Sequence, residues 1–120
     1  MKRTDRVILN KIVYYCDEIA NDLARFGNDI ESFRRDTSYQ RSTTSCVTQI
    51  GELTNHLSQE FRENHPETHW RSIVCMRNIV VHDYERLDFV TVWDAITNDV
   101  PALKKSIKEI LSKEGRGTSE

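Results

Sequence analysis

Apolar residues recur at three- and four-residue steps along most of the chain, which is the spacing of one face of an α-helix. The first such stripe begins after Thr4 or Asp5, either of which can cap a helix. It stops at Gly27 and Asn28, two residues that favour helix ends. Its apolar members are Ile8, Ile12, Tyr15, Ile19 and Leu23. A short helical segment over residues 30–35 is expected next.

The middle of the chain predicts two longer helices separated by a proline. Residues 37–46 could form a loop or the solvated start of the first of these helices, and a start near residues 37–38 is favoured. This helix continues to His65, because the residue before Pro66 is pushed out of the helical region. Gly51 lies within it, at a place where another helix can approach closely. The second covers residues 68–84. The two apolar stripes are Val47, Ile50, Leu53, Leu57 and Phe61, then Trp70, Ile73, Met76 and Val80.

The last helix begins at Asp88, a good N-cap, and Pro101 predicts a kink or break near residues 98–100 because proline removes a backbone hydrogen bond. Its stripe is Phe89, Trp93, Ile96, Val100, Leu103, Ile107 and Ile110. Short turns join the helices, which favours antiparallel neighbours. The pattern therefore predicts an all-α, up-and-down bundle of about five helices in one domain over residues 1–114. Residues 115–120 are expected to form a disordered tail.

Composition narrows the class of protein. Of the 120 residues, 38% are hydrophobic and 30% charged, which suits one soluble domain and neither a disordered chain nor a membrane protein. No apolar run approaches the ~18 residues of a membrane-spanning helix. The N-terminus lacks the apolar stretch of a signal peptide, so a cytoplasmic location is expected.

The charge balance, 17 Lys and Arg against 19 Asp and Glu, argues against a non-specific nucleic-acid binder, although it leaves room for a local basic cleft. Three cysteines without a CxxC pair (Cys16, Cys46 and Cys75) are expected to be buried free thiols. His65 and His69 are four residues apart, but Pro66 interrupts their helix and no third ligand is near. We therefore expect no metal site and no cofactor.

Ionisable residues bracket an aliphatic centre in residues 76–88, MRNIVVHDYERLD. On an ideal helix, Arg77 and Tyr84 lie within roughly 20° of each other, and Asn78 shares a face with His82. Arg77 and His82 are about 140° apart. Two arrangements could bring these two side chains to one substrate: the helix loosens near His82, or two copies face each other across a symmetric dimer.

Arginine and histidine together suit cleavage of RNA by its own 2′-hydroxyl. With an unperturbed pKa of ~6.5, histidine can move a proton near neutral pH. The arginine fork matches phosphate oxygens and stabilises charge on a phosphorane. A structural alternative remains open, in which His82 caps the helix C-terminus and Arg77 pairs with Asp83 or Glu85.

The pattern R-x-x-x-x-H-x-Y, with a polar residue after the arginine, resembles the signature of the HEPN superfamily. More specifically, it resembles the HepT-like ribonuclease toxins encoded beside minimal nucleotidyltransferase antitoxins. The resemblance continues through residues 49–84, with IGE, HPE-x-x-W and MRN-x-x-x-H-x-Y, and through residues 88–111, with a VW pair and NDVP. It covers residues 5–112 and is weakest between Arg35 and Val47. The chain lacks the glycine that many relatives have at the turn after the motif.

This resemblance implies a HEPN-like helical protomer in a two-fold dimer whose two motifs line a shared cleft. It also implies a metal-independent endoribonuclease that arrests growth unless its antitoxin is present. Arg77 and His82 are then the catalytic pair, with Asn78 and Asp83 supporting the site. Tyr84 is the residue to which a nucleotidyltransferase antitoxin would add AMP.

Arg34, Tyr39 and Arg41 are further candidates for RNA contact outside the cleft. The expected partners are RNA, a second copy of the chain, and the cognate nucleotidyltransferase, in a dimer or a larger hetero-oligomer. The alternative function is a non-catalytic helical module that binds a nucleotidyltransferase or a nucleotide, in which Arg77 holds a nucleotide phosphate instead of cleaving RNA.

Overall fold

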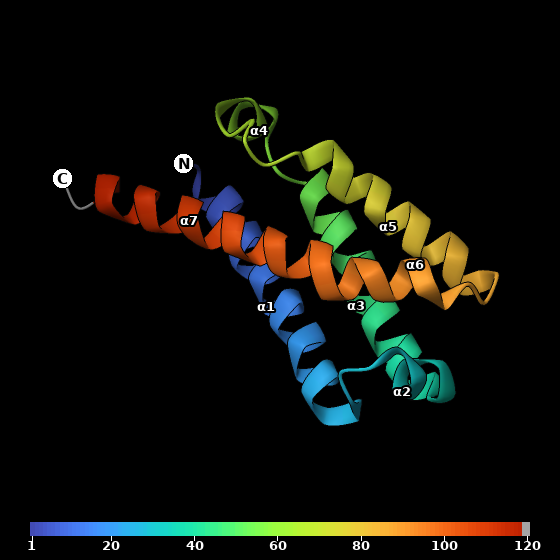
Figure 1. Ribbon diagram of the computed structural model, residues 1–120. Coiled ribbons are helices and arrows are strands. Elements are labelled where there is room, and N and C mark those ends of the chain that lie inside the picture. Colours follow the sequence, from blue (N-terminus) through green and yellow to red (C-terminus); the bar gives the residue numbers. More distant parts are fainter. Residues whose placement is uncertain (119–120) are drawn as a thin grey trace.

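The computed structural model describes residues 1–118, with side chains as far as Glu114. The described part is an elongated all-α domain with extents of 51 × 25 × 20 Å (Figure 1). The predicted all-α class is confirmed, although about six helical segments replace the expected five, and the last of them contains a π-helical segment. The last helix continues to Thr118, so residues 115–118 of the predicted disordered tail are helical, while residues 119–120 lie outside the described part.

Helix α3 (Thr37–Asn55) forms the centre of the bundle. It packs against α1 (Arg3–Phe26) on one side and α5 (Trp70–Glu85) on the other. In Figure 1 the chain runs down α1, up α3 and down α5, and α7 (Val100–Thr118) then returns across α1. The largest fully buried side chains include Leu9, Ile12, Ile19, Phe33, Tyr39, Val47, Ile50, Val80, Val92, Ile96 and Ile107.

Helix α1 begins earlier than its sequence suggests. Its N-cap residue is Lys2, so the prediction that Thr4 or Asp5 caps it is wrong. Asp5 is instead buried inside the first turn, where its carboxylate accepts hydrogen bonds from the backbone N–H and the hydroxyl of Ser58, at 2.8 and 2.7 Å. The predicted end at Gly27 is confirmed, with φ of 117°, a conformation that L side chains rarely adopt.

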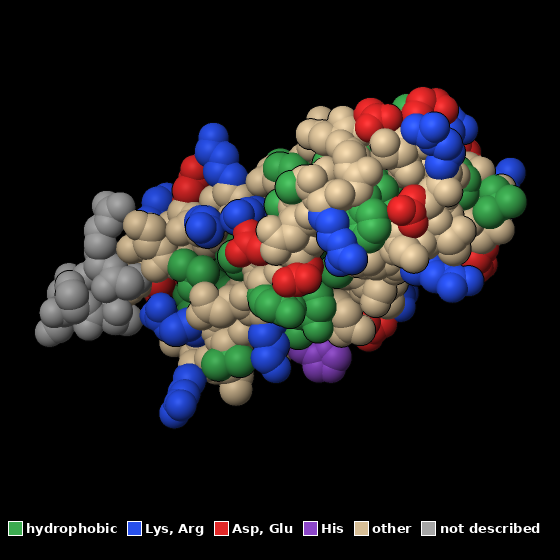
Figure 2. Space-filling view, turned by 90° about the horizontal axis from the view of Figure 1, so that it is seen from below, with side chains coloured by type: hydrophobic (Ala, Val, Ile, Leu, Met, Phe, Trp, Pro, Cys, Tyr) green, Lys and Arg blue, Asp and Glu red, His purple; other side chains and the backbone are tan. Residues whose placement is uncertain are grey.

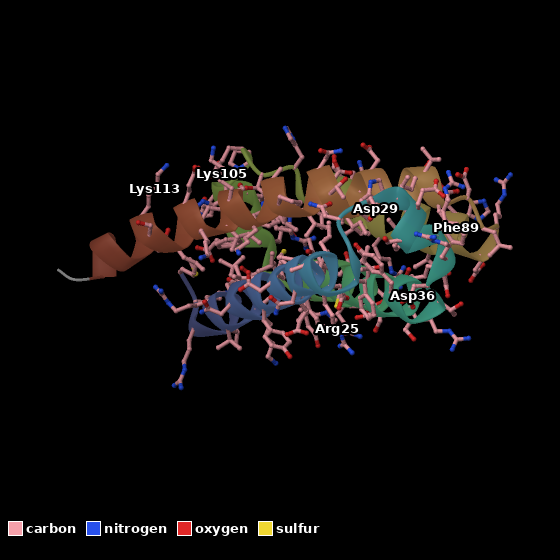
Figure 3. The ribbon with its side chains drawn as sticks, turned by 60° about the horizontal axis from the view of Figure 1, so that its bottom comes forward. Arg25, Asp29, Asp36, Phe89, Lys105 and Lys113 are labelled. Atoms are coloured by element: carbon pink, nitrogen blue, oxygen red, sulfur yellow. The ribbon has the colours of Figure 1, made fainter. Side chains whose placement is uncertain are left out.

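Two aspartates cap the next helices. In α2 (Ile30–Arg35), Asp29 accepts from the N–H of Ser32 at 3.0 Å, and at the start of α3, Asp36 accepts from the N–H of Ser38 at 2.9 Å. Figure 3 labels both aspartates at the ends of α2. These bonds satisfy N–H groups that lack partners in a first helical turn. The predicted short segment and the predicted start of α3 are both confirmed.

The predicted single helix up to His65 is wrong, because the chain leaves α3 at Asn55 and starts α4 (Gln59–Asn64) after a turn. Ser58 is the N-cap of α4, with extended backbone and a hydroxyl that accepts from the N–H of Phe61 at 3.1 Å. The same residue is bound to Asp5, 53 positions earlier. The break therefore comes from a tertiary contact, while Leu57 and Phe61 still join the core as their spacing predicts.

Helix α5 ends in a Schellman motif. The N–H of Asp88 donates to the carbonyl of Asp83 at 2.8 Å, and the N–H of Leu87 donates to the carbonyl of Tyr84 at 3.0 Å. Leu87 has φ of 60°, in the left-handed position that glycine usually fills in this motif. The missing glycine thus leaves the turn geometry intact and places a leucine in an unfavourable conformation.

The last helix contains one π-helical segment. After α6 (Phe89–Asp94), residues Ala95–Asp99 form a π-helical segment, η1, in which the N–H of Val100 donates to the carbonyl of Ala95. Pro101 lacks an N–H and cannot continue the ordinary hydrogen-bond ladder, so the helix widens just before it. The predicted irregularity is confirmed in position. Asp88 is the N-cap of α6, as predicted, but its side chain makes no capping hydrogen bond.

The cysteines only partly follow prediction. Cys16 and Cys46 are buried, and burial raises their pKa values to about 12 and about 11, so both are protonated thiols at neutral pH. Cys75 is exposed, which contradicts the predicted burial of all three. Its position on the outer side of α5 explains this. Within the described chain, no helix combines the length and apolarity needed to cross a membrane.

We expect Leu87→Gly to stabilise the fold by about 1 kcal/mol, because glycine relieves the left-handed strain. Leu87 is 70% exposed, so little apolar burial is lost. Thermal unfolding should show a melting temperature higher by roughly 4 °C. The matched control is Gly27→Ala, which should lower it, since an added Cβ would lie 2.7 Å from the Ser32 hydroxyl. An unchanged or lower melting temperature for Leu87→Gly would contradict this account.

Candidate active site

Arg77 lies where α5 packs against α3, and it is half-buried with its guanidinium bound on both sides. Its Nη2 donates to Oε1 of Glu52 at 2.7 Å, and its Nη1 donates to Oδ1 of Asn78 at 2.8 Å. Its Nε is buried and has no hydrogen-bond partner. The guanidinium is thus held from two sides, by one carboxylate on α3 and by its own neighbour on α5.

The stem of Arg77 rests directly on the backbone of α3 at Gly51. A Cβ built on Gly51 would lie 2.6 Å from both Cβ and Cγ of Arg77, closer than real side chains pack. The close helix approach predicted at Gly51 is confirmed, and the approaching group is the candidate catalytic arginine. Any larger residue at position 51 would have to displace it.

His82 lies on the outer side of the same helix, exposed to solvent. Its carbonyl accepts from the N–H of Arg86 at 3.2 Å, so α5 stays regular past His82 instead of loosening there. Among residues 1–114, the imidazole has no hydrogen-bond or ion-pair partner. His82 is the basic residue in the last turn of α5, where a cation can interact with the helix dipole, although its imidazole makes no capping hydrogen bond in this part of the chain. The alternative pairing of Arg77 with Asp83 or Glu85 is wrong, because Arg77 pairs with Glu52.

Tyr84 lies two turns beyond Arg77 on nearly the same face of α5. Its ring is half-buried, with its centroid 6.5 Å from that of Phe89. Within the described residues its hydroxyl makes no hydrogen bond, which leaves the oxygen free to react. Asp83, one residue earlier, is half-buried and contributes its carbonyl to the end of the helix.

The three candidates for RNA contact outside the motif differ in their exposure to solvent. Tyr39 is fully buried, and its hydroxyl donates to the carbonyl of Gly27 at 3.0 Å. A phenol with no exposed surface cannot touch RNA in this fold, so Tyr39 has a packing role instead. Arg34 and Arg41 are exposed on α2 and the first turns of α3, and Arg34 pairs with Glu31 at 3.8 Å.

Exposed apolar side chains flank the motif. Ile79 is 49% exposed on the outer side of α5, three residues before His82, and Leu87 and Val90 are 70% and 56% exposed at the following turn and on α6. A groove of about 420 Å³ runs between α5 and the α6–η1 segment and is lined in part by Cys75 and Ile79. Ile79, three residues before His82 on the same helix, therefore places uncovered apolar surface next to the imidazole.

Charges of both signs are interspersed on the surface. In the view of Figure 2, Lys and Arg alternate with Asp and Glu and form no continuous basic belt on that face. Lys105 and Lys113 point away from α7 in Figure 3, and Lys104 of the same helix pairs with Asp17. In residues 1–118, no group of three or more His, Cys, Asp or Glu is arranged to hold a metal ion.

Sequence reasoning missed Glu52 as the partner of Arg77. The two residues are 25 positions apart on different helices, so no periodicity relates them. One signal was available, since the IGE segment at residues 50–52 belongs to the block that carries the resemblance. The structure gives each of its three residues a place: Ile50 in the core, Gly51 under the Arg77 stem, and Glu52 at the guanidinium.

Comparison with known proteins finds one matching family model, "Ribonuclease HepT-like", over residues 16–110. The chain is 32% identical over 112 residues to a "Putative RNase" of Caldanaerobacter subterraneus subsp. tengcongensis, which covers 93% of this chain and 98% of that protein. A "Putative RNase" of Methanocaldococcus jannaschii is 31% identical over 76% of this chain and 85% of its own length.

A "Probable ribonuclease HepT" of Thermococcus cleftensis is 28% identical over 92% of this chain and 98% of its own length. No solved structure matches the chain significantly.

Proposed function

The chain belongs to the HepT-like ribonuclease family, and we propose that it is a metal-independent endoribonuclease with Arg77 and His82 as its catalytic pair. The observation that carries the proposal is the state of these two side chains. The imidazole of His82 is exposed and has no bond among the described residues. The guanidinium of Arg77, on the same helix, is held in one orientation by its bond to Glu52. An exposed imidazole without a bond can exchange a proton with a ligand, and an anchored guanidinium can bind the phosphate of that ligand.

The reaction uses the 2′-hydroxyl of RNA as its nucleophile. His82 removes the proton from this hydroxyl, the 2′-oxygen bonds to the adjacent phosphorus, and the bond to the 5′-oxygen of the next nucleotide breaks. The leaving 5′-oxygen takes a proton from water, and His82 later releases to solvent the proton that it accepted. The products are a 2′,3′-cyclic phosphate and a 5′-hydroxyl end. Arg77 stabilises the negative charge on the phosphorane between these steps.

The purified protein should cut RNA fully in the presence of EDTA and leave cyclic phosphate ends. His82→Ala should lower the rate at least about 100-fold, because proton transfer by a positioned histidine contributes 10²–10⁴-fold. Circular dichroism should show the variant folded, since His82 makes no side-chain bond in the described residues. A strict requirement for Mg²⁺ would contradict the mechanism. A folded protein that binds but does not cut RNA would instead support the non-catalytic binding module.

We propose further that the active unit is a two-fold dimer formed over the outer side of α5. The geometry of one protomer supports this, because Arg77 and His82 project about 140° apart on a helix that stays regular. The second copy would cover Ile79, Leu87 and Val90 beside His82, as an isologous interface does. Each cleft would then combine Arg77 of one protomer with His82 of the other.

Mixing two inactive variants tests this shared site. Arg77→Ala and His82→Ala should each be inactive alone, whereas an equal mixture, refolded together, should regain about a quarter of wild-type activity. Half of the dimers are then mixed, and each mixed dimer has one cleft with both residues intact. Size-exclusion chromatography should show both variants to be dimers. No recovered activity from verified mixed dimers would place each site within one protomer.

In cells, this activity would make the protein the toxin of a toxin–antitoxin module. Its partner would be a nucleotidyltransferase antitoxin that adds AMP to Tyr84, in a hetero-oligomer of the two chains. The Tyr84 oxygen bonds to the α-phosphorus of ATP, pyrophosphate leaves, and the phenolic proton is released. The adduct adds bulk and negative charge beside Arg77, where an RNA phosphate would bind.

Incubation with the partner and ATP should increase the intact mass by whole AMP units and abolish RNA cutting. Tyr84→Phe should gain no AMP and should escape neutralisation, because it lacks the acceptor oxygen. Tyr14, which is 57% exposed on α1, provides the matched control: Tyr14→Phe should still be modified. AMP increments that persist in Tyr84→Phe would show that another residue is the acceptor.

A further inference from the structure

We infer that Glu52 is a positioning residue for Arg77, acting together with the space left by Gly51. These two residues of α3 are called the arginine cradle below. The inference rests on the proposed function, since it concerns how the candidate catalytic arginine is held ready for a phosphate. It assigns a role to the IGE segment, which lies outside the Arg77–His82–Tyr84 pattern.

Gly51 fixes the direction of the Arg77 stem. The stem lies so close to α3 that an added Cβ would be 2.6 Å from its Cβ and Cγ and 3.2 Å from its Cδ. Three successive carbons of the arginine therefore follow the helix surface. This contact also encloses Nε, which is buried without a partner, so the phosphate-binding capacity of the side chain is confined to its tip.

Glu52 fixes the rotation of that tip. Arginine has five N–H groups. In this structure, one on Nη2 binds Glu52, one on Nη1 binds Asn78, and the one on Nε is buried. One N–H on each terminal nitrogen is left for the oxygens of a phosphate. The bonds to Glu52 and Asn78 involve different nitrogens and so prevent the guanidinium plane from turning. The two free N–H groups therefore keep one orientation before the substrate binds.

The ion pair is too exposed to act mainly through stability. The side chains of Arg77 and Glu52 are 32% and 49% exposed, and surface pairs of this kind contribute little to folding. Glu52 also places a negative charge close to an incoming phosphate, which opposes RNA binding. The Glu52 carboxylate therefore weakens the binding of RNA in the ground state. It also holds Arg77 in the geometry that stabilises the phosphorane, as preorganised hydrogen-bond donors do.

Removal of the Glu52 carboxylate should affect kcat and KM differently. Glu52→Ala should lower kcat by about 10- to 100-fold, because an arginine that can turn stabilises the transition state less well. KM for RNA should stay the same or fall, since a repelling charge is gone. Steady-state cleavage of a short RNA at several RNA concentrations measures both constants. The matched control is Glu109→Ala, which removes an exposed carboxylate from α7 and should change neither.

A second measurement, by NMR and without RNA, tests whether Glu52 restricts the motion of the Arg77 side chain. In the wild type, the ¹⁵N-resolved NMR signal of Arg77 Nε–H should exchange slowly with water, and rotation about the bond from Nε to the guanidinium carbon should be hindered. Glu52→Ala should speed both processes while the backbone spectrum stays folded. Arg77→Lys, which removes the signal, provides its assignment.

The two measurements separate the inference from the proposed function. A lower kcat together with faster rotation of Arg77 supports the cradle. An unchanged or higher kcat in Glu52→Ala overturns it, and so does a lower kcat with Arg77 still held as in the wild type. If the wild type does not cut RNA, the proposed function fails, and the NMR comparison alone still decides whether Glu52 positions Arg77.

Discussion

The contact on which the site depends is the close approach of α5 to α3 at Gly51. The missing Cβ allows the Arg77 stem to lie on the α3 backbone, and the neighbouring Glu52 then meets the guanidinium at 2.7 Å. Helix packing and the candidate chemistry are thus joined at one point. A bulkier residue there would separate the helices or expel the arginine, because packed side chains have little room to move. The position is at once structural and functional.

The rest of the fold holds α3 and α5 in this relation. Helix α1 covers the other side of α3, and the bond from Asp5 to Ser58 fixes where the chain turns after α3. Pro101 then widens the last helix into the η1 segment, whose Ala95 and Ile96 are buried in the core. Together these features place α5 along α3 with one side of it, which carries His82, facing outward.

Elements whose signals are local were predictable. Helical periodicity located α1, α3, α5 and the last helix, since a stripe of apolar residues must face the core. Gly27 located the end of α1 and Pro101 located the irregular turn in the last helix, because each residue acts directly on the backbone. The break after Asn55 was missed, because the apolar stripe continues through Leu57 and Phe61 and only the distant Asp5 shows that Ser58 leaves the helix. The N-cap of α1 was predicted at Thr4 or Asp5 instead of Lys2, because the partner of Asp5 is the distant Ser58.

The motif could be recognised from the sequence. Spacing alone gives the positions around the helix of its four residues, Arg77, Asn78, His82 and Tyr84. The family resemblance follows from the residue types at these positions. The sequence also determined that Arg77 and His82 point apart. Only the tertiary structure decided what holds Arg77, because Glu52 reaches it from another helix and no periodicity relates two helices. It likewise decided that Tyr39 is buried and Cys75 exposed. Spacing fixes directions around one helix axis, whereas the packing of helices decides which of those directions meet protein and which meet solvent.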